Sequence, residues 1–428
     1  MNSGPVRRVA LVAANRIPFA RSNSAYAKLS NQDMLIATLR GLVEKCSLQG
    51  DVLGEVVGGA VMKHARDWNL IRECVLSSGL SARTPAYDVQ QACGTGLEAA
   101  ILVANKIALG QINAGIACGV DTTSDVPVAV SRRLQRALMD LNGARSTGAR
   151  ILPVLRALNP GNLVPELPSN KEPRTRLSMG QHAERTAQHW GITREAQDAL
   201  ALSSHQHLAR AYQEGFFDDL VMPFKSLTRD TTLRPDSTAQ SLAALRPAFD
   251  RKVGTITAGN ASPLTDGASA VLLASEEWAH SHRLPILAYF AAAETAAVDF
   301  LDESRDGLLM APVYAVPRML AKAGLQLQDF DFYEIHEAFA AVVLCTLAAW
   351  ESERFCRERL GRSTALGAID PTRLNVNGSS IAAGHPFAAT GPRILGTLAK
   401  LLAQKGSGRG LISICAAGGQ GVTAILER

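Results

Sequence analysis

The sequence has few of the features that disulfide-stabilised, zinc-binding or membrane-spanning proteins need. Its seven cysteines are odd in number and irregularly spaced, which argues against a disulfide framework and for a reducing compartment. No two of them form a Cys-x-x-Cys pair, so we expect no structural zinc site. The apolar run at 342–350 is far shorter than a membrane span. Residues 1–8 have no apolar segment typical of a secretory signal, so we expect a cytoplasmic protein.

What the chain does have is enough apolar sequence for a large interior. Hydrophobic residues make up 47% and charged residues 19% of its 428 positions, so we expect two or three domains. The net charge of +5 is unevenly placed, because nine basic residues face three acidic ones between positions 132 and 176. This cluster predicts one anionic partner surface rather than general affinity for nucleic acid. The phosphates of a ligand, a membrane and a partner subunit are the three candidates.

Short apolar strands alternate with amphipathic helices in the first part of the chain. This alternation predicts a largely parallel, buried sheet. The expected strands are 6–13, 55–61, 85–90 and 114–119, and the expected helices are 32–46, 70–78 and 94–109. Five prolines between 151 and 173 then predict irregular structure. Beyond them we expect helices at 178–190 and 193–214 and strands at 254–258 and 268–274.

The second part of the chain looks like a repeat of the first. The expected strands are 285–290, 330–335, 373–376, 411–415 and 421–426, and the expected helices are 312–323, 338–352 and 386–405. Cys93 begins a helix whose following strand ends at Cys118, and His385 begins a helix whose following strand ends at Cys415. Two such halves facing each other would bring both helix starts into one cleft. We therefore divide the chain into an N-terminal half (1–123 plus 251–275), an inserted loop domain (124–250) and a C-terminal half (276–428).

Reactive side chains lie on the glycine-rich turns of both halves. Cys93 stands in Gln-Gln-Ala-Cys-Gly-Thr-Gly, where a helix start favours the thiolate. A lone cysteine is more often a small buried hydrophobe, but His385, before Pro386, offers the base that thiolate chemistry needs. Cys415 precedes two glycines, whereas its repeat mate Cys118 is given a structural role. This pattern suggests acyl transfer through a thioester.

His336 and Glu337 open a further helix after an apolar strand. They would serve either as helix caps or as a polar wall that holds a water molecule at the cleft.

These segments stand in the order found in the thiolase family, which the chain resembles over essentially its whole length. The matching segments are 90–96, 259–268, 336–340 (His-Glu-Ala-Phe-Ala), 384–386 (Gly-His-Pro) and 415–419 (Cys-Ala-Ala-Gly-Gly). His336, the segment 386–391 and the insert after 121–124 most resemble the thiolase (beta) subunit of the trifunctional fatty-acid oxidation complexes. Ala417 is a departure, because glycine is usual there. The resemblance implies an α/β thiolase fold, with two tandem βαβ-type halves in a layered αβαβα core and an inserted loop domain.

The resemblance also implies the role of each site residue. Cys93 would attack the 3-keto carbon of a 3-ketoacyl-coenzyme A (3-ketoacyl-CoA) after His385 takes its proton, and Cys415 would protonate the departing acetyl-CoA enolate and then deprotonate CoA. One oxyanion hole would be His385 plus a water held by His336, and the other the N–H groups of Cys93 and Ala417. Four further positions would contact the CoA substrate: Met179, Ala258, Ser262 and Phe339.

The expected activity is therefore that of a 3-ketoacyl-CoA thiolase of fatty-acid beta-oxidation, with CoA as substrate and neither cofactor nor metal. A biosynthetic acetoacetyl-CoA thiolase is the alternative, because cleavage and condensation use the same residues. Ketoacyl synthases, which use two histidines or a histidine and an asparagine, are disfavoured by Cys415. A non-catalytic acyl-CoA-binding protein would not need the reactive groups. As partners we expect a second copy (a homodimer or dimer of dimers), a hydratase/dehydrogenase subunit, or a membrane surface contacted through 132–177.

Overall fold

The computed structural model describes residues 6–301 and 307–428, and within them ten strands form one mixed sheet. The strand order is β4-β3-β5-β6-β1-β7-β10-β9-β8, with β2 paired to β6. The strands of the first half are β1 (Val9–Arg16), β2 (Ala20–Arg21), β3 (Glu55–Gly59), β4 (Ala86–Asp88), β5 (Ala114–Asp121) and β6 (Thr265–Ser275). Those of the second are β7 (Ala288–Ala297), β8 (Phe332–Ile335), β9 (Arg409–Ala416) and β10 (Gln420–Glu427).

The strand order mirrors itself about the junction of β1 and β7, which meet at two residue pairs, Ala10 with Tyr289 and Leu11 with Ala288. On one side β3 and β5 are parallel and β6 closes antiparallel; on the other β8 and β9 are parallel and β10 closes antiparallel. The predicted repeat is therefore confirmed, with Cys118 on β5 and Cys415 on β9. The prediction of a largely parallel sheet is wrong, because β6, β10 and the junction strands run antiparallel to their neighbours.

Two helices, α3 (Thr95–Ala108) and α14 (Thr390–Lys405), pack between the halves of the sheet. Glycines let their first turns touch. A Cβ on Gly96 would lie 2.3 Å from Pro392 Cδ, and one on Gly391 would lie 2.2 Å from the Leu97 nitrogen. This close approach positions the residues that precede each helix.

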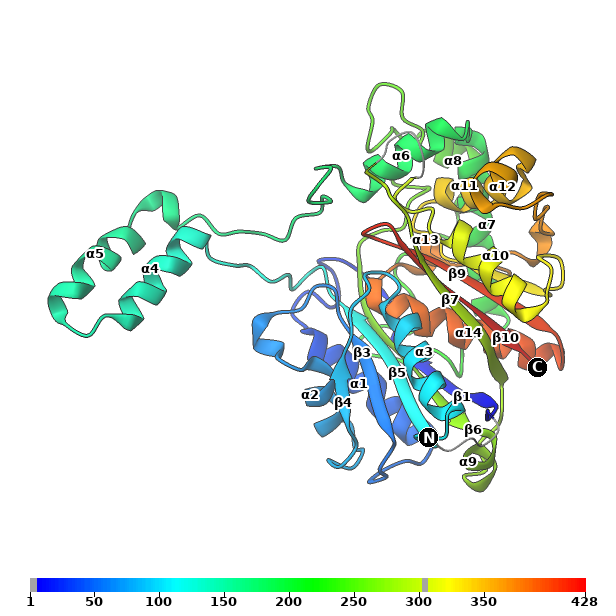
Figure 1. The fold of residues 1–428 in the computed structure, drawn as a ribbon, viewed down its shortest axis with the longest axis horizontal. Coiled ribbons are helices and arrows are strands. Elements are labelled where there is room, and N and C mark those ends of the chain that lie inside the picture. Colours follow the sequence, from blue (N-terminus) through cyan, green and yellow to red (C-terminus); the bar gives the residue numbers. More distant parts are fainter. Residues whose placement is uncertain (1–5, 302–306) are drawn as a thin grey trace.

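Further helices cover the outer faces (Figure 1). Over the N-terminal half lie α1 (Asn31–Lys45), α2 (Leu70–Leu76) and α9 (Glu276–Ser281). Over the C-terminal half lie α10 (Pro312–Ala323), α11 (Ala340–Glu351) and α12 (Glu353–Leu360). The layers are thus outer helices, one half of the sheet, the central helices α3 and α14, the other half of the sheet, and outer helices. This order confirms the expected layered core. Shorter or more peripheral helices are α6 (Met179–His189), α7 (Arg194–Gln213), α8 (Ala239–Ala243) and α13 (Ser380–Ala383).

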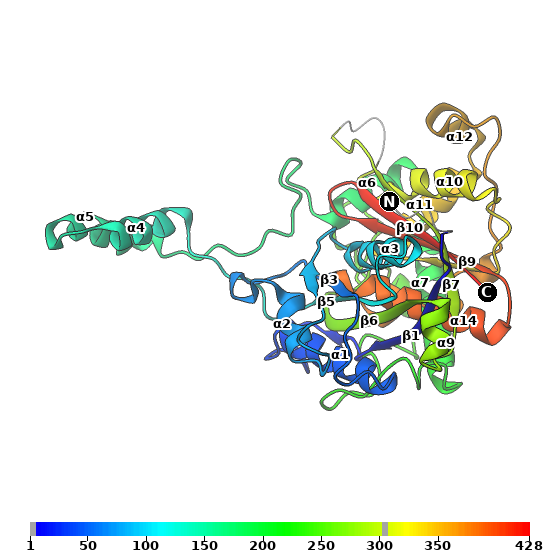
Figure 2. The ribbon, with the colours of Figure 1, turned by 60° about the horizontal axis from the view of Figure 1, so that its bottom comes forward.

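A hairpin of two helices, α4 (Arg132–Gly143) and α5 (Thr147–Ala157), stands away from this body on two long connections (Figures 1 and 2). The prediction that residues 151–173 are irregular is wrong in its first part, because α5 contains Pro153. Pro153 and Ala137 are the buried residues of the hairpin, so packing between its helices offsets the hydrogen bond that proline cannot make. Among the described residues no helix has both the length and the apolar character needed to cross a membrane.

Three other predicted elements are wrong. Residues 373–376 are not a strand, since Leu374 makes a single bridge to Tyr333 after a 3₁₀ turn that begins at Pro371. Residues 254–258 likewise contribute one isolated bridge, at Thr257. The helix predicted at 386–405 begins at Thr390, because Pro386 has a non-helical ψ of 80° and a 3₁₀ turn follows it. His385 therefore lies before the helix rather than at its first turn.

Candidate active site

Cys93 and His385 meet between the two halves, with Sγ and Nε2 3.0 Å apart. The turn that carries Cys93 is held by Thr95, whose Oγ1 accepts from the Gln91 N–H at 2.8 Å and donates to the Ala92 carbonyl at 2.7 Å. Ala92 has a φ of 48°, a left-handed conformation that costs a non-glycine residue about 1 kcal/mol or more. The thiol is thus fixed on a strained turn immediately before α3.

The segment that carries His385 is anchored to the opposite half. Its backbone N–H donates to Thr265 Oγ1 at 2.7 Å, and the Ala388 N–H donates to Asp121 Oδ2 at 2.8 Å. The imidazole Nδ1 lies 2.6 Å from Thr390 Oγ1. Strands β5 and β6 therefore hold the backbone of this segment, and Thr390 of α14 orients the ring.

Burial decides the protonation of this pair. It raises the pKa of Cys93 to about 12, against the opposing effect of the Ala417 and Cys93 N–H groups. It lowers the pKa of His385 to about 3, with a smaller contribution from Arg393. At neutral pH the pair is consequently a thiol beside a neutral imidazole. The expectation that the helix start makes this thiol easy to ionise is wrong, because desolvation outweighs it.

His336 is the third side chain beside Cys93 and His385. Its ring centroid lies 4.1 Å from that of His385, and Cys93, His336 and His385 place their ligand-type atoms within 4.8 Å of one another. Burial lowers the pKa of His336 well below its ordinary value, so this ring is neutral too. Its Nδ1 lies 2.8 Å from Ser380 Oγ, whereas its Nε2 has no hydrogen-bond partner among the described residues. A thiolate and two imidazoles would also suit a zinc ion, so the expectation that no metal is needed stays a prediction.

Cys415, at the end of β9, is 4% exposed and belongs to an apolar cluster with Ala338, against which Met179 and Phe339 pack. Burial, and then the Cys93 thiol, raise the pKa of Cys415. The sequence prediction that distant segments meet is therefore confirmed for both cysteines and both histidines, while their catalytic roles stay predictions.

The Ala417 N–H forms a hydrogen bond toward the Cys93 sulfur. Gly418 and Gly419, with φ of 82° and 72°, make the turn, and Ala417 is outside the positive-φ region. The departure from the usual glycine therefore causes no backbone strain.

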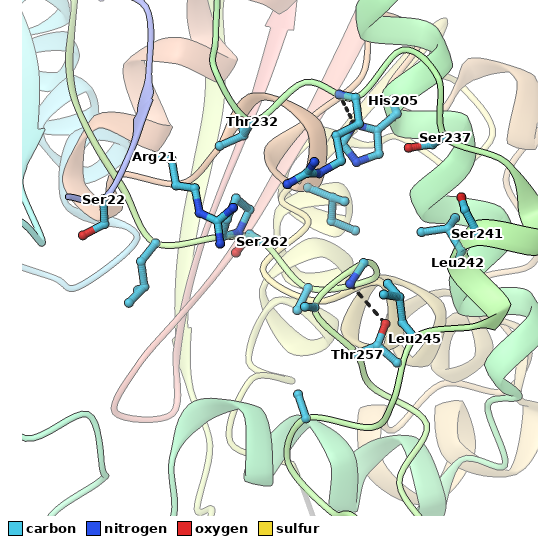
Figure 3. Close-up of a pocket in the computed structure, with 18 of the residues that line it drawn as sticks. Arg21, Ser22, His205, Thr232, Ser237, Ser241, Leu242, Leu245, Thr257 and Ser262 are labelled. Carbon is cyan, nitrogen blue, oxygen red and sulfur yellow. Dashed lines mark hydrogen bonds between the residues drawn. The ribbon is translucent and has the colours of Figure 1, made fainter. Parts of the chain in front are cut away.

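A cavity of about 770 Å³ adjoins the apolar cluster that holds Cys415. The predicted contact residues Ala258 and Ser262 line it (Figure 3). Phe249 and Ala261 are shared between the cavity wall and the cluster that holds Cys415. Figure 3 shows Arg21 and Ser262 on one side of the opening and His205, Ser237 and Ser241 on the other.

The guanidinium groups of this wall come from Arg21 and Arg234, neither of which the sequence analysis identified. Arg21 ends the two-residue strand β2 and Arg234 lies in a loop, and no sequence signal distinguishes either. Among the described lining residues there is none from 132–176, so the structure does not support that basic cluster as the site for CoA phosphates.

A partly buried thiol beside a buried imidazole, with a second cysteine between two α/β halves, defines a class of enzymes that transfer acyl groups through a cysteine. Models of the thiolase N-terminal and C-terminal domains match residues 9–277 and 284–428, and the chain therefore belongs to the thiolase family of acyltransferases.

Similarity to several known proteins extends over nearly the whole chain. A protein named 3-ketoacyl-CoA thiolase from Shewanella baltica (strain OS185) is 41% identical over 426 residues, which are 98% of this chain and 97% of the relative. One of the same name from Shewanella sediminis (strain HAW-EB3) is 42% identical over equal shares. The structure of human mitochondrial 3-ketoacyl-CoA thiolase superimposes with a TM-score of 0.81 at 27% identity, covering 99% of this chain and 100% of that one. The Bacillus anthracis acetyl-CoA acetyltransferase does so with a TM-score of 0.82 at 29% identity, over the same shares.

Proposed function

We propose that this protein is a 3-ketoacyl-CoA thiolase, which cleaves a 3-ketoacyl-CoA with CoA to give acetyl-CoA and an acyl-CoA shortened by two carbons. The observation that carries the proposal is the 3.0 Å contact between Cys93 and His385, with Cys415 and the Ala417 N–H beside it. The full-length relatives named 3-ketoacyl-CoA thiolase support the same reaction. The similar acetyl-CoA acetyltransferase keeps the condensing reaction as the alternative.

The first half-reaction uses the neutral pair. His385 Nε2 takes the Cys93 proton as Sγ attacks the keto carbon, which matches a resting thiol with a raised pKa. The carbon–carbon bond breaks, the acyl group stays on Cys93, and the acetyl-CoA enolate takes a proton from Cys415. The second half-reaction restores both groups. Cys415 takes the proton of CoA, the CoA thiolate attacks the thioester, and His385 returns its proton to Cys93.

Binding follows from the cavity wall. Arg21 and Arg234 supply positive charge for the phosphates of CoA, and Ala258 and Ser262 contact its pantetheine arm. Met179 and Phe339, which pack against the Cys415 cluster, contact the substrate close to the thiols.

The test is CoA-dependent cleavage of acetoacetyl-CoA and of longer 3-ketoacyl-CoA substrates by the purified full chain. We expect acetyl-CoA as a product in every case where cleavage occurs. Consumption of a malonyl thioester without cleavage of any 3-ketoacyl-CoA would instead identify a ketoacyl synthase. Binding of acyl-CoA without turnover of either substrate would identify a non-catalytic protein.

We propose a second role for the α4–α5 hairpin, which is contact with an anionic membrane surface. Its arginines are exposed, and apolar side chains interleave with them at exposures of 44% to 65%. The exposed apolar residues are Leu138, Met139, Ile151, Leu152, Leu155 and Leu158. Each basic residue near an anionic surface contributes about 1 kcal/mol. A partner subunit with hydratase and dehydrogenase activities, and a dimeric core, are further proposals that rest on the family resemblance.

Vesicle flotation tests the hairpin. The change Arg132→Glu with Arg133→Glu is expected to lower binding to vesicles containing phosphatidylserine and to leave acetoacetyl-CoA cleavage unchanged. The matched control is Arg354→Glu with Arg357→Glu on α12, which is also exposed and helical. Equal flotation of all three proteins would reject the hairpin as a membrane contact.

A further inference from the structure

A buried line of polar groups lies behind His336. Arg393 Nη2 donates to Ser380 Oγ at 2.8 Å, and Ser380 Oγ lies 2.8 Å from His336 Nδ1. The three residues are 4%, 0% and 1% exposed, so water does not compete with these contacts. The line connects α14, α13 and the segment after β8.

The direction of each hydrogen bond follows from what the groups can donate. A guanidinium has no acceptor, so Ser380 Oγ must accept from Arg393. Among the described residues, His336 Nδ1 is the other atom bonded to Ser380 Oγ, and it is the one that can accept the hydroxyl hydrogen. A neutral imidazole that accepts at Nδ1 carries its proton on Nε2.

The resulting Nε2–H is free for a ligand. It has no partner among the described residues, yet it lies within the group formed with Cys93 and His385. Leaving a buried donor unpaired costs about 1–3 kcal/mol. Such a cost is offset when a substrate atom, or the negative charge that develops on it, accepts the hydrogen bond.

We propose that Arg393 and Ser380 are positioning residues that hold His336 in the Nε2–H form, so that it is a preset donor to the oxyanion of the reaction. The reaction itself is the one given under Proposed function, and the proposal rests on it. The adjacent ring takes the opposite form, because His385 Nε2 must accept the Cys93 proton and its Nδ1–H then donates to Thr390 Oγ1. Two rings 4.1 Å apart thus act as one acceptor and one donor.

The Arg393 guanidinium keeps its charge, and with it the hydrogen bond to Ser380, over the working pH range. Burial lowers the pKa of Arg393 to about 10, which leaves the guanidinium protonated at neutral pH. The buried Glu334 carboxyl opposes this lowering where it is ionised, which is above about pH 8. The donor to Ser380 is therefore present throughout the range in which the enzyme would work.

Nitrogen-15 NMR of histidine-labelled full-length protein reads the tautomer without any substrate. The chain has nine histidines, and the His336 signals are assigned from their loss in His336→Gln. We expect the Nε2–H form in the wild type, a shift toward Nδ1–H or a mixture in Ser380→Ala, and the Nε2–H form again in Ser380→Thr, which restores the hydroxyl. Ser379→Ala is the matched control, because Ser379 Oγ also accepts from Arg393 but, among the described residues, forms no hydrogen bond with His336.

Steady-state cleavage of acetoacetyl-CoA gives the second readout. Ser380→Ala should lower kcat by at least about tenfold with little change in KM, below the roughly 10²–10³-fold cost of removing an oxyanion donor outright, and Ser380→Thr should recover most of the loss. An Nδ1–H form in the wild type, or a Ser380→Ala protein with unchanged tautomer and kcat, would overturn the proposal. A wild-type protein that does not cleave 3-ketoacyl-CoA would overturn the proposed function, while the NMR result would still report on the tautomer.

Discussion

At the scale of single residues, the site depends on a nucleophile that stays protonated until it reacts. Because Cys93 alone is positioned to carry the acyl group, Cys93→Ala should abolish formation of an acyl-enzyme. Mass spectrometry after mixing with acetoacetyl-CoA measures this directly. Acylation of the variant to the wild-type extent would remove Cys93 from the nucleophile role.

Cys415 and Cys118 give a matched pair, since they occupy corresponding strands of the two halves and both are buried. Cys415→Ala should lower cleavage by roughly 10²–10⁴-fold, as expected for loss of a general acid–base group, while acylation of Cys93 by a reactive acyl-CoA persists. The Cys118 thiol instead donates to the Val57 carbonyl inside the N-terminal half, so Cys118→Ala should leave turnover close to that of the wild type. A large loss of cleavage in Cys118→Ala with none in Cys415→Ala would assign the acid–base role to Cys118 instead.

The neutral pair has a pH signature. With the pKa of Cys93 raised to about 12 and that of His385 lowered to about 3, neither group changes protonation near neutrality. The single-turnover rate of Cys93 acylation, measured without free CoA, should therefore be nearly constant between pH 6 and 9. A clear inflection near pH 7 that persists in Asp121→Asn would indicate a thiolate–imidazolium pair instead, since burial raises the pKa of Asp121 to about 7 as well.

Sequence patterns found the reactive residues but not their supports. Cys93, His385 and Cys415 stand out because a reactive side chain beside several glycines is rare. Ser380 and Thr390 are common residues whose effect depends on neighbours that only the fold supplies. Arg393 could have been noticed in the sequence, because it is the one charged residue in 390–399, the apolar first part of α14.

At the scale of elements, the contact between α3 and α14 sets the distance between Cys93 and His385. Gly391→Ala would place a Cβ 2.2 Å from the Leu97 nitrogen, so the two helix starts must separate. We expect a loss of about 1–3 kcal/mol in the free energy of unfolding, typical of overpacking, together with slower acylation. Gly148→Ala on α5 is the control, because its Cβ would meet nothing within 4 Å.

If Gly391→Ala and Gly148→Ala unfolded at the same temperature and were acylated equally fast, the helix contact would not control the site. On one side of this contact, the segment that leads into α14 was hard to predict. Long apolar segments such as 312–323 and 94–109 were located to within one residue, because their periodicity is strong. The turns at 384–389 were not, since their shape follows from contacts with Thr265 and Asp121.

At the scale of the whole molecule, a buried carboxyl should shape the dependence of stability on pH. Burial raises the pKa of Glu334 from 4.5 to about 8, so the folded state holds a proton that the unfolded state has lost. The contribution of this proton to the free energy of unfolding is fully present below pH 4.5 and is lost as the pH rises through 8. His336 and His385 have lowered pKa values and act on the acid side of 6.5, so the window from 6.5 to 8.5 reports mainly on buried carboxyls.

Glu334→Gln should therefore flatten the fall in melting temperature between pH 6.5 and 8.5. Glu358→Gln, with a side chain 50% exposed, is the control and should keep the wild-type slope. Parallel slopes for Glu334→Gln and the wild type would show that Glu334 is ionised in the folded state at neutral pH.

The arrangement of the two halves was predictable from their repeat. Strand direction was not, because an apolar run has the same sequence pattern in a parallel and in an antiparallel strand.

The separation of 292 positions between Cys93 and His385 also has a consequence for the timing of biosynthesis. At a synthesis rate of about 5–20 residues per second, Cys93 waits roughly 15–60 seconds before the ribosome adds its histidine. During that interval α14 is missing, so the thiol is neither buried nor paired and keeps the reactivity of an ordinary cysteine. A growing chain should accordingly be most open to alkylation or oxidation at Cys93 before its second half emerges, and the completed chain least so.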